Sequence, residues 1–275
     1  MKLVKRRIFP VFATLVLVFV SPACSVWEDR EDCPCWLDIL FDRCTAEDTL
    51  QVAGWNGTTI FFEEIVPADW PDGFEHEVVK GLVRTCVFRG IENSVRDGYE
   101  LTIPIGSQAD RVFLHRAEVV CSGEFAVDTV KLRKEWTTVN VKVRVDGVEV
   151  TPMTRAGESL EGYHFVVRGD ICGTDLLTGN PIGGEFMFEP QAGEYGVFTF
   201  RLPRHDGYAE ELFLDIYREG VLVDEMELGR QLAGAGYDWS EEDLSDVDMN
   251  LNMATRDVTI TVQPWEDQGH EDIIF

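Results

Sequence analysis

The chain has 275 residues, of which 45% are hydrophobic, so it can fill the cores of one or two globular domains and is not an acidic disordered tail. It carries 50 acidic and 24 basic residues, with a formal net charge of −26. A surface of this sign repels phosphate backbones and anionic lipid head groups, so we expect no nucleic-acid partner and no polybasic membrane contact.

Residues 1–23 have the parts of a secretory signal peptide: four basic residues among the first seven, an apolar stretch over residues 11–20, and small residues before Cys24. The apolar stretch is too short to span a bilayer. A cysteine at the cleavage point is typical of a bacterial lipobox, which predicts an S-diacylglycerol and an N-palmitoyl group on Cys24. The alternative is ordinary signal cleavage nearby, with Cys24 left as a free or paired thiol.

Residues 24–32 follow as a short acidic tether with four carboxylates and one arginine. A solvated leader is one interpretation. The other is a sorting signal, because acidic residues directly after a lipidated cysteine resemble the surface-export signals of anaerobe lipoproteins. We therefore expect a lipid-anchored protein of the outer membrane, exposed at the cell surface.

Period-two alternation dominates the rest of the chain. In residues 137–146 the side chains of Val139, Val141 and Val143 alternate with polar ones, which predicts a half-buried strand. Similar segments cover residues 36–42, 58–63, 82–89, 101–105, 112–120, 164–168, 197–202, 212–217, 221–227, 246–253 and 258–262. Helical turns are expected only at 227–233 and 240–244. The fold class is therefore all-β, built from antiparallel sandwiches.

The sequence Lys131-Leu132-Arg133-Lys134 is the only dense basic cluster after the signal peptide, and a strong strand follows it. We place the domain junction there. The organisation is then a signal peptide (1–23), an acidic tether (24–32), an N-terminal β-sandwich (33–130) and a C-terminal β-sandwich (131–275).

Six cysteines follow Cys24: Cys33, Cys35, Cys44, Cys86, Cys121 and Cys172. An even number in an exported protein permits three disulfides, with 15 possible connectivities. A Cys-Pro-Cys sequence without a second close pair is a weak zinc signal. Disulfides and buried free thiols both remain open.

Metal motifs are incomplete. His76 and Glu77 begin like a zinc-protease helix, but the fifth position is Lys80. The spacing of Asp246, Asp248 and Asn250 is that of a calcium loop, yet the later loop positions lack the required Gly and Glu, and strand alternation explains these residues better. We expect no metal and no cofactor.

Catalytic motifs are also missing: there is no G-x-S-x-G and no P-loop, and Gly234-Ala235-Gly236 is interpreted as a helix-ending turn. Cys172 and His164 are a conceivable nucleophile and base, but a disulfide or core thiol is the better interpretation. We therefore expect the protein to have no enzymatic activity. The tryptophans stand at 27, 36, 55, 70, 136, 239 and 265. They suit either a sugar-stacking platform or the filling of sandwich cores.

These features together resemble the fimbrium-anchoring lipoproteins of type V (Bacteroidales-type) fimbriae, the minor-fimbrium anchor family. The resemblance covers nearly the whole mature chain. It is carried by Cys24, Cys33-Pro34-Cys35 with the following strand, and residues 129–133, 165–170, 176–179 and 258–265. The cysteines at 44, 86, 121 and 172 depart from the family pattern.

The resemblance implies two tandem transthyretin-like sandwiches and a structural role. Its partners would be fimbrial subunits of the same cell, joined by strand complementation, and outer-membrane lipid through Cys24. An anchor keeps its own first strand, here residues 37–41, while residues 258–262 or 272–275 are the candidate donor. The alternatives are a surface glycan-binding lipoprotein, with an exposed row of Trp or Tyr, and a lipid-anchored hydrolase.

Overall fold

The computed structural model describes residues 34–41, 44–145, 148–149, 162–191 and 197–265. In these ranges the chain is almost entirely β, with one α-helix (α2, Leu228–Gly234) and one 3-10 turn (η1, Pro67–Asp69). The all-β expectation is confirmed. No helix within these ranges is long and apolar enough to cross a membrane.

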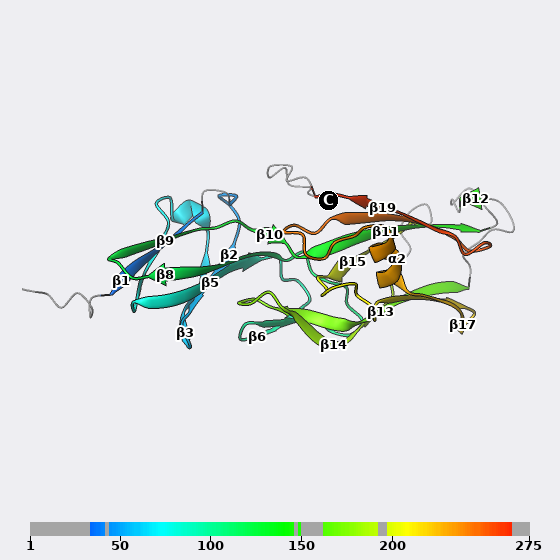
Figure 1. Ribbon diagram of the computed structural model, residues 1–275, viewed down its shortest axis with the longest axis horizontal. Helices are drawn as coiled ribbons and strands as arrows, with labels where there is room; N and C mark the ends of the chain where they lie inside the picture. The colour runs from blue at the N-terminus through cyan, green and yellow to red at the C-terminus, as the bar shows by residue number, and fades with distance from the viewer. Residues whose placement is uncertain (1–33, 42–43, 146–147, 150–161, 192–196, 266–275) are drawn as a thin grey trace, which may run out of the picture.

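The first sandwich consists of two sheets (Figure 1). Sheet A has the order β4 (Phe74–Val78), β1 (Cys35–Leu40), β9 (Phe125–Thr129), and sheet B the order β10 (Arg133–Lys134), β8 (Phe113–Cys121), β5 (Gly81–Arg89), β2 (Leu50–Trp55), β3 (Thr59–Ile65). Alternation directs Leu37 and Ile39 of β1 inward, where they meet Val52, Val83 and Val87 of sheet B in one buried cluster.

The second sandwich also has two sheets. Sheet D has the order β12 (Val148–Glu149), β11 (Trp136–Val145), β18 (Asp246–Asn252), β19 (Val258–Gln263), with β15 (Val197–Pro203) also on β11. Sheet C has the order β17 (Val221–Met226), β16 (Phe213–Arg218), β13 (Tyr163–Asp175), β7 (Glu100–Thr102), β6 (Val95–Asp97), with β14 (Pro181–Phe188) on β13.

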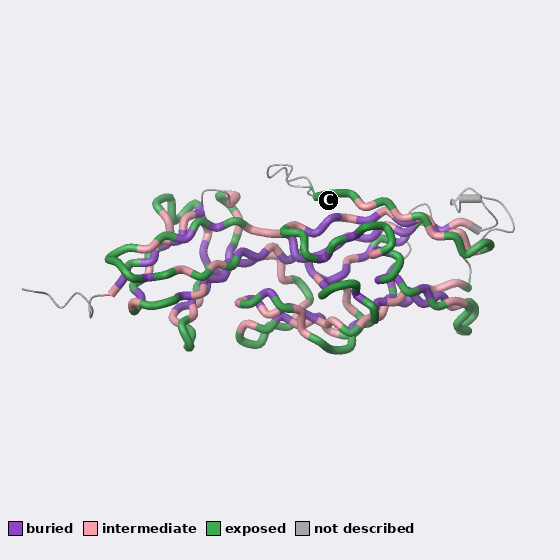
Figure 2. The backbone as a smooth tube through the Cα atoms, viewed as in Figure 1, coloured by how far each residue is buried: buried purple, intermediate pink, exposed green. Residues whose placement is uncertain are grey.

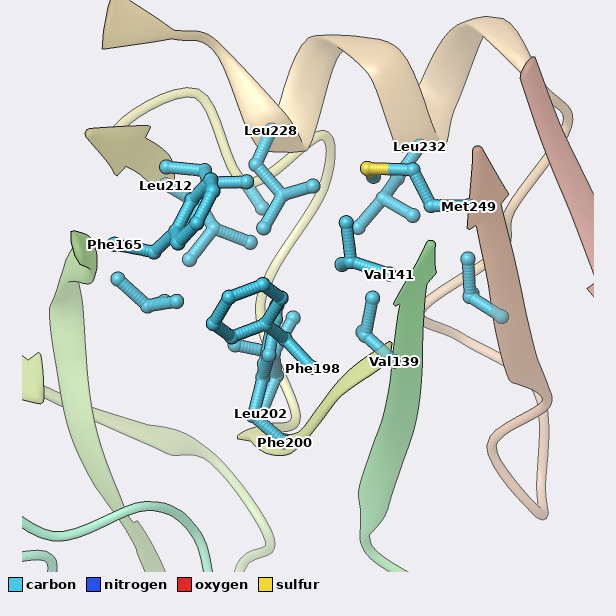
Figure 3. Packing of buried hydrophobic residues seen from close by; sticks show 14 of the residues in the cluster. Val139, Val141, Phe165, Phe198, Phe200, Leu202, Leu212, Leu228, Leu232 and Met249 are labelled. Atoms are coloured by element: carbon cyan, nitrogen blue, oxygen red, sulfur yellow. The ribbon is translucent and has the colours of Figure 1, made fainter. Parts of the chain in front are cut away.

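The core of the second sandwich forms where the inner faces of sheets C and D meet (Figure 3). Val139 and Val141 of β11 and Met249 of β18 point toward Phe165 of β13, and Leu232 of helix α2 covers this core. The alternation in residues 137–146 and 246–253 therefore marks the buried face, as expected.

Three features of the topology differ from antiparallel tandem sandwiches. β1 pairs with β9 in parallel, and β11 pairs with β18 in parallel. In addition, β6 and β7, which precede residue 131 in the chain, join sheet C through β13. The chain therefore crosses between the two sandwiches three times near their junction.

The two sandwiches lie end to end along the long axis of the molecule (Figures 1 and 2). Between them a third buried cluster joins Phe88 and Leu114, on the outer face of sheet B, to Leu101 of β7 and to Leu176 after β13. The junction is therefore packed with apolar side chains as well as crossed by the linker.

Of the two expected helical turns, one is present. Helix α2 matches residues 227–233 and ends before Gly236, whose φ of 84° suits glycine, as the interpretation of that turn predicted. The helix expected at 240–244 was wrong. The carbonyl oxygens of Trp239, Glu241 and Glu242 instead accept hydrogen bonds from Arg204.

Candidate functional site

The first strand, β1, is enclosed in its own sandwich. It is the central strand of sheet A, paired with β4 on one side and β9 on the other. Leu37 and Ile39 are fully buried, and Phe41 beyond the strand is almost so. A strand held on both edges, with its alternate side chains in the core, leaves no open groove at this position.

The last described strand, β19, is an edge strand of sheet D. It follows β18 in the chain and pairs with it, on the side of β18 opposite to β11. The first sandwich has no equivalent strand, because β9, the parallel partner of β1, leads into the linker. Val258, Ile260 and Val262 pack partly buried against the core, while Thr259 and Thr261 are exposed. β19 thus has the alternation of a strand that fills one side of a groove.

The end of β19 is fixed at the junction. Trp265 lies against Trp136 with ring centroids 6.4 Å apart, and its ring covers the ammonium of Lys134 at 4.8 Å. Residues 266–275, which include the expected hinge and the alternative donor at 272–275, lie outside the described residues.

A cleft of about 730 Å³ opens beside the junction. Its basic side chains are Arg84, Arg116, Lys131, Arg133 and Arg204, and these come from the outer face of sheet B, the linker and the segment after β15. Such a gathering of cations in a strongly acidic protein is the arrangement expected of an anion site.

The cations of the cleft are, however, already paired with carboxylates. Arg84 pairs with Glu118 at 2.8 Å, and Arg133 with Asp243 at 3.0 Å. Likewise Arg204 pairs with Glu135 at 2.6 Å, Arg116 lies 3.9 Å from Glu135, and Lys131 lies 3.5 Å from Glu242. Each cation that lines the cleft already faces a carboxylate, so the cleft offers an anionic ligand little uncompensated charge.

Lys134 carries the central contact of this network. Its side chain is fully buried, and its ammonium donates to the Leu244 carbonyl at 2.8 Å and to Asp246 at 2.7 Å. Burial lowers the pKa of Lys134, and the bond to Asp246 opposes that shift. The basic linker cluster noticed in the sequence therefore joins the first sandwich to the 238–245 loop and to the start of β18 in the second.

A buried hydrogen-bond chain links three strands of the first sandwich beside the cleft. The Thr85 hydroxyl donates to Asp128 at 2.5 Å, and Asp128 lies 3.0 Å from Nε2 of His115. The Lys131 amide donates to Nδ1 of His115, which places the imidazole proton on Nε2. Because the hydroxyl contacts the carboxylate and not the imidazole, this is no activated nucleophile; it ties β5, β8 and β9 together.

The incomplete metal motifs are strand residues. His76 lies in β4, where its ring contacts that of Phe61 with the centroids 4.5 Å apart, and is not in a helix. Asp246, Asp248 and Asn250 alternate along β18 with fully buried apolar residues. No group of three metal-ligating side chains occurs within the described ranges.

The cysteines in the described ranges, at 35, 44, 86, 121 and 172, are free thiols. Burial raises the pKa of Cys86 to about 12, and burial together with the adjacent Cys35 thiol raises the pKa of Cys121 to about 11. Cys172 and His164 stand eight positions apart on β13, or roughly 26 Å, which excludes them as a nucleophile and base.

The tryptophans of the described ranges form no row. Trp136 and Trp239 are buried, whereas Trp36 and Trp70, both partly exposed, lie beside opposite ends of β1. A sugar-stacking platform built from aligned indoles is absent from this part of the chain. The predicted signal peptide, the tether with Trp27, Cys24 and Cys33 lie outside the described residues.

No family model matches the chain, and no curated protein matches it. Solved structures share its fold. The fimbrial anchor protein Mfa2 from Porphyromonas gingivalis has a TM-score of 0.55 at 11% identity, covering 85% of this chain and 98% of that one. A candidate adhesin from Bacteroides ovatus has a TM-score of 0.56 at 12% identity, covering 88% and 96%.

A candidate polysaccharide-binding protein from Bacteroides thetaiotaomicron has a TM-score of 0.56 at 12% identity, covering 86% of this chain and all of that one. At such identities the likeness is one of fold. It extends over both sandwiches, so the chain has the architecture of a group of proteins that includes a fimbrial anchor.

Proposed function

We propose that this protein is an accessory or anchoring subunit of a fimbria, held on the outer membrane through lipid on Cys24 and joined to the fibre by β-strand complementation. Each sandwich is, in this proposal, a transthyretin-like domain, and the protein has no catalytic role. The observation that carries the proposal is the enclosed position of β1, with Leu37 and Ile39 fully buried.

The physical reason is that strand exchange needs a vacant groove. A subunit whose first strand stays in place cannot accept a further donor there, so the fibre ends at that position. The candidate donors are the edge strand β19, whose alternate residues Val258, Ile260 and Val262 suit insertion beside a partner's strand, and the tail at 272–275.

The test compares three strains. Cys24→Ala should move the protein from the membrane fraction to the soluble or unprocessed fraction and release fibres into the medium. Deletion of residues 266–275, which spares β19 and the Trp265 contact, should release fibres while the lipoprotein stays on the cell if the tail is the donor, and should leave them attached if β19 is. Removal of the whole protein should release fibres and change their length.

Three outcomes contradict the proposal. Palmitate labelling of the Cys24→Ala protein refutes the lipid site, and fibres retained after the 266–275 deletion refute the tail as donor. If loss of the whole protein leaves the fibres unchanged and abolishes polysaccharide binding, the glycan-binding alternative is correct.

A further inference from the structure

One end of the first sandwich carries an unusual set of exposed apolar side chains, here named the apolar pole: Trp36, Val79, Leu82, Val120 and Phe125. Their exposed fractions are 37%, 73%, 48%, 68% and 64%. Isolated exposed apolar residues are common, but several large ones at one end of a domain mark a contact surface.

The strand registers place these residues at the same end. Cys35 at the start of β1 pairs with Val78 at the end of β4, and Gly81 at the start of β5 pairs with Cys121 at the end of β8. Trp36 lies opposite Phe125, and Leu82 lies opposite Val120. Val79 stands in the turn between β4 and β5.

The position of the pole in the molecule indicates what covers it. β1 begins at the end of the first sandwich farthest from the second sandwich (Figure 1). Cys24 precedes the first described residue, Pro34, by ten positions. A fully extended chain of that length reaches about 35 Å, so a lipid on Cys24 keeps this end of the molecule close to the bilayer.

We propose that the apolar pole rests in the head-group region of the membrane and sets the protein upright on it. The inference rests on the lipid anchoring proposed above. Tethering raises the local concentration of the pole at the bilayer, so a modest apolar surface suffices to hold it there. Tryptophan is favoured at this depth because its ring is apolar and its N–H polar.

Charge favours an upright orientation. The two turns of the pole carry one charge of each sign, Lys80 and Glu124. The outer face of sheet A carries Glu77 next to the pole, opposite Trp36, and farther along it Glu75 opposite Asp38. The whole chain is strongly acidic. Laying that face on an anionic bilayer brings three carboxylates to the lipid head groups, whereas standing on the pole brings fewer and adds the positive charge of Lys80.

The experiment uses the full lipidated protein in a Trp27→Phe background, reconstituted in phosphatidylcholine vesicles with brominated acyl chains. Bromine quenches nearby indoles, so Trp36→Phe should remove most of the lipid-quenchable emission. Trp70→Phe is the matched control, because Trp70 is 40% exposed in the same sandwich but lies beside the other end of β1. It should leave that component intact.

A second pair of variants keeps Trp36. Val120→Ser with Phe125→Ser should reduce the quenching of Trp36, whereas Val221→Ser with Leu222→Ser, on an exposed hairpin of the second sandwich, should not. Circular dichroism checks that each variant is folded.

The outcomes separate the two proposals. Protein that floats with the vesicles, but whose quenching is unchanged by Trp36→Phe, is lipid-anchored without a membrane-resting pole, which overturns this inference alone. Protein that does not float refutes the lipid anchor and the inference with it. Shielding of Trp36 by a purified fimbrial subunit instead of by lipid assigns the pole to a protein partner and also overturns the inference.

Discussion

His205 shows how one buried side chain makes the fold sensitive to acid. Its imidazole is 2% exposed, packs against Trp239 with ring centroids 4.9 Å apart, and has no hydrogen-bond partner for Nε2 within the described part of the chain. Burial lowers the pKa of His205 to about 4, because the charged form cannot be solvated there.

Stability should therefore fall as the pH drops from about 6.5, where the unfolded imidazole begins to bind a proton, to about 4, where the folded one does. Above about pH 6.5 the imidazole is neutral in both states and no stability is lost. Protonation of the unfolded state lowers the free energy of unfolding by up to about 3 kcal/mol as the pH falls to 4. His205→Phe should flatten this part of the pH profile, measured by urea unfolding at pH 7 and pH 4.5. His164→Gln, on a side chain stacked against Tyr217, is the control; an unchanged slope in the His205 variant contradicts the prediction.

At the scale of elements, contacts between the linker and residues 238–246 hold the two sandwiches together. The ammonium of Lys134 is held by Asp246 and by a carbonyl, and it lies 5.2 Å from the Trp136 ring and 4.8 Å from the Trp265 ring. A buried ammonium is tolerated only when its N–H groups have hydrogen-bond acceptors. Removing either Lys134 or Asp246 therefore leaves the other without its partner.

Lys134→Met should destabilise the protein by about 2–3 kcal/mol, at the lower end for a broken buried pair because Asp246 remains 30% exposed. Lys131→Met, in the same linker but half-exposed, should cost less than about 0.5 kcal/mol. Combining Lys134→Met with Asp246→Asn in a double-mutant cycle should give a total below the sum of the single losses. Strict additivity would show that the two side chains do not interact.

At the scale of the whole molecule, the apolar cluster between the sandwiches packs one domain against the other. Phe88 from the first sandwich contacts a cluster that includes Leu101 of β7 and Leu176 after β13, both of which belong with the second. Two domains that share buried surface unfold together when the shared surface is worth more than the difference in their stabilities.

We expect one unfolding transition in the unmodified protein, followed by calorimetry and tryptophan fluorescence. Leu176→Ala, at a fully buried position, should cost about 3 kcal/mol and separate the transition into two. Leu50→Ala, in the core of the first sandwich, is the control and should lower stability without weakening the shared cluster. Two transitions already present in the unmodified protein would contradict the cooperative junction.

The strands that alternation predicts are those whose larger apolar residues face inward. Val139 and Val141 in β11, and Met249 in β18, are of this kind, and their burial follows from period two alone. β9 was not predicted because its exposed residues Phe125 and Val127 are apolar. The alternation of apolar and polar residues therefore does not reveal which face of β9 is buried.

β4 and β14 were missed for related reasons. In β4 the inward face has only two apolar residues, Phe74 and Val78, with His76 between them and Glu75 and Glu77 outside, and β14 contains two adjacent glycines that interrupt the pattern. The helix expected at 240–244 failed because Arg204, distant in sequence, takes carbonyls that a helix would use internally.

The sequence by itself determined the all-β class, most of the strands, the lipobox-like context of Cys24 and the presence of a basic cluster at 131–134, since each depends on local pattern or local chemistry. The tertiary structure alone decided the parallel pairing of β1 with β9 and of β11 with β18, the transfer of β6 and β7 to sheet C, and the neutralised cleft. It also gathered the apolar pole from four strands and a turn. These features join residues far apart in the chain, and no local preference specifies which distant segments will meet.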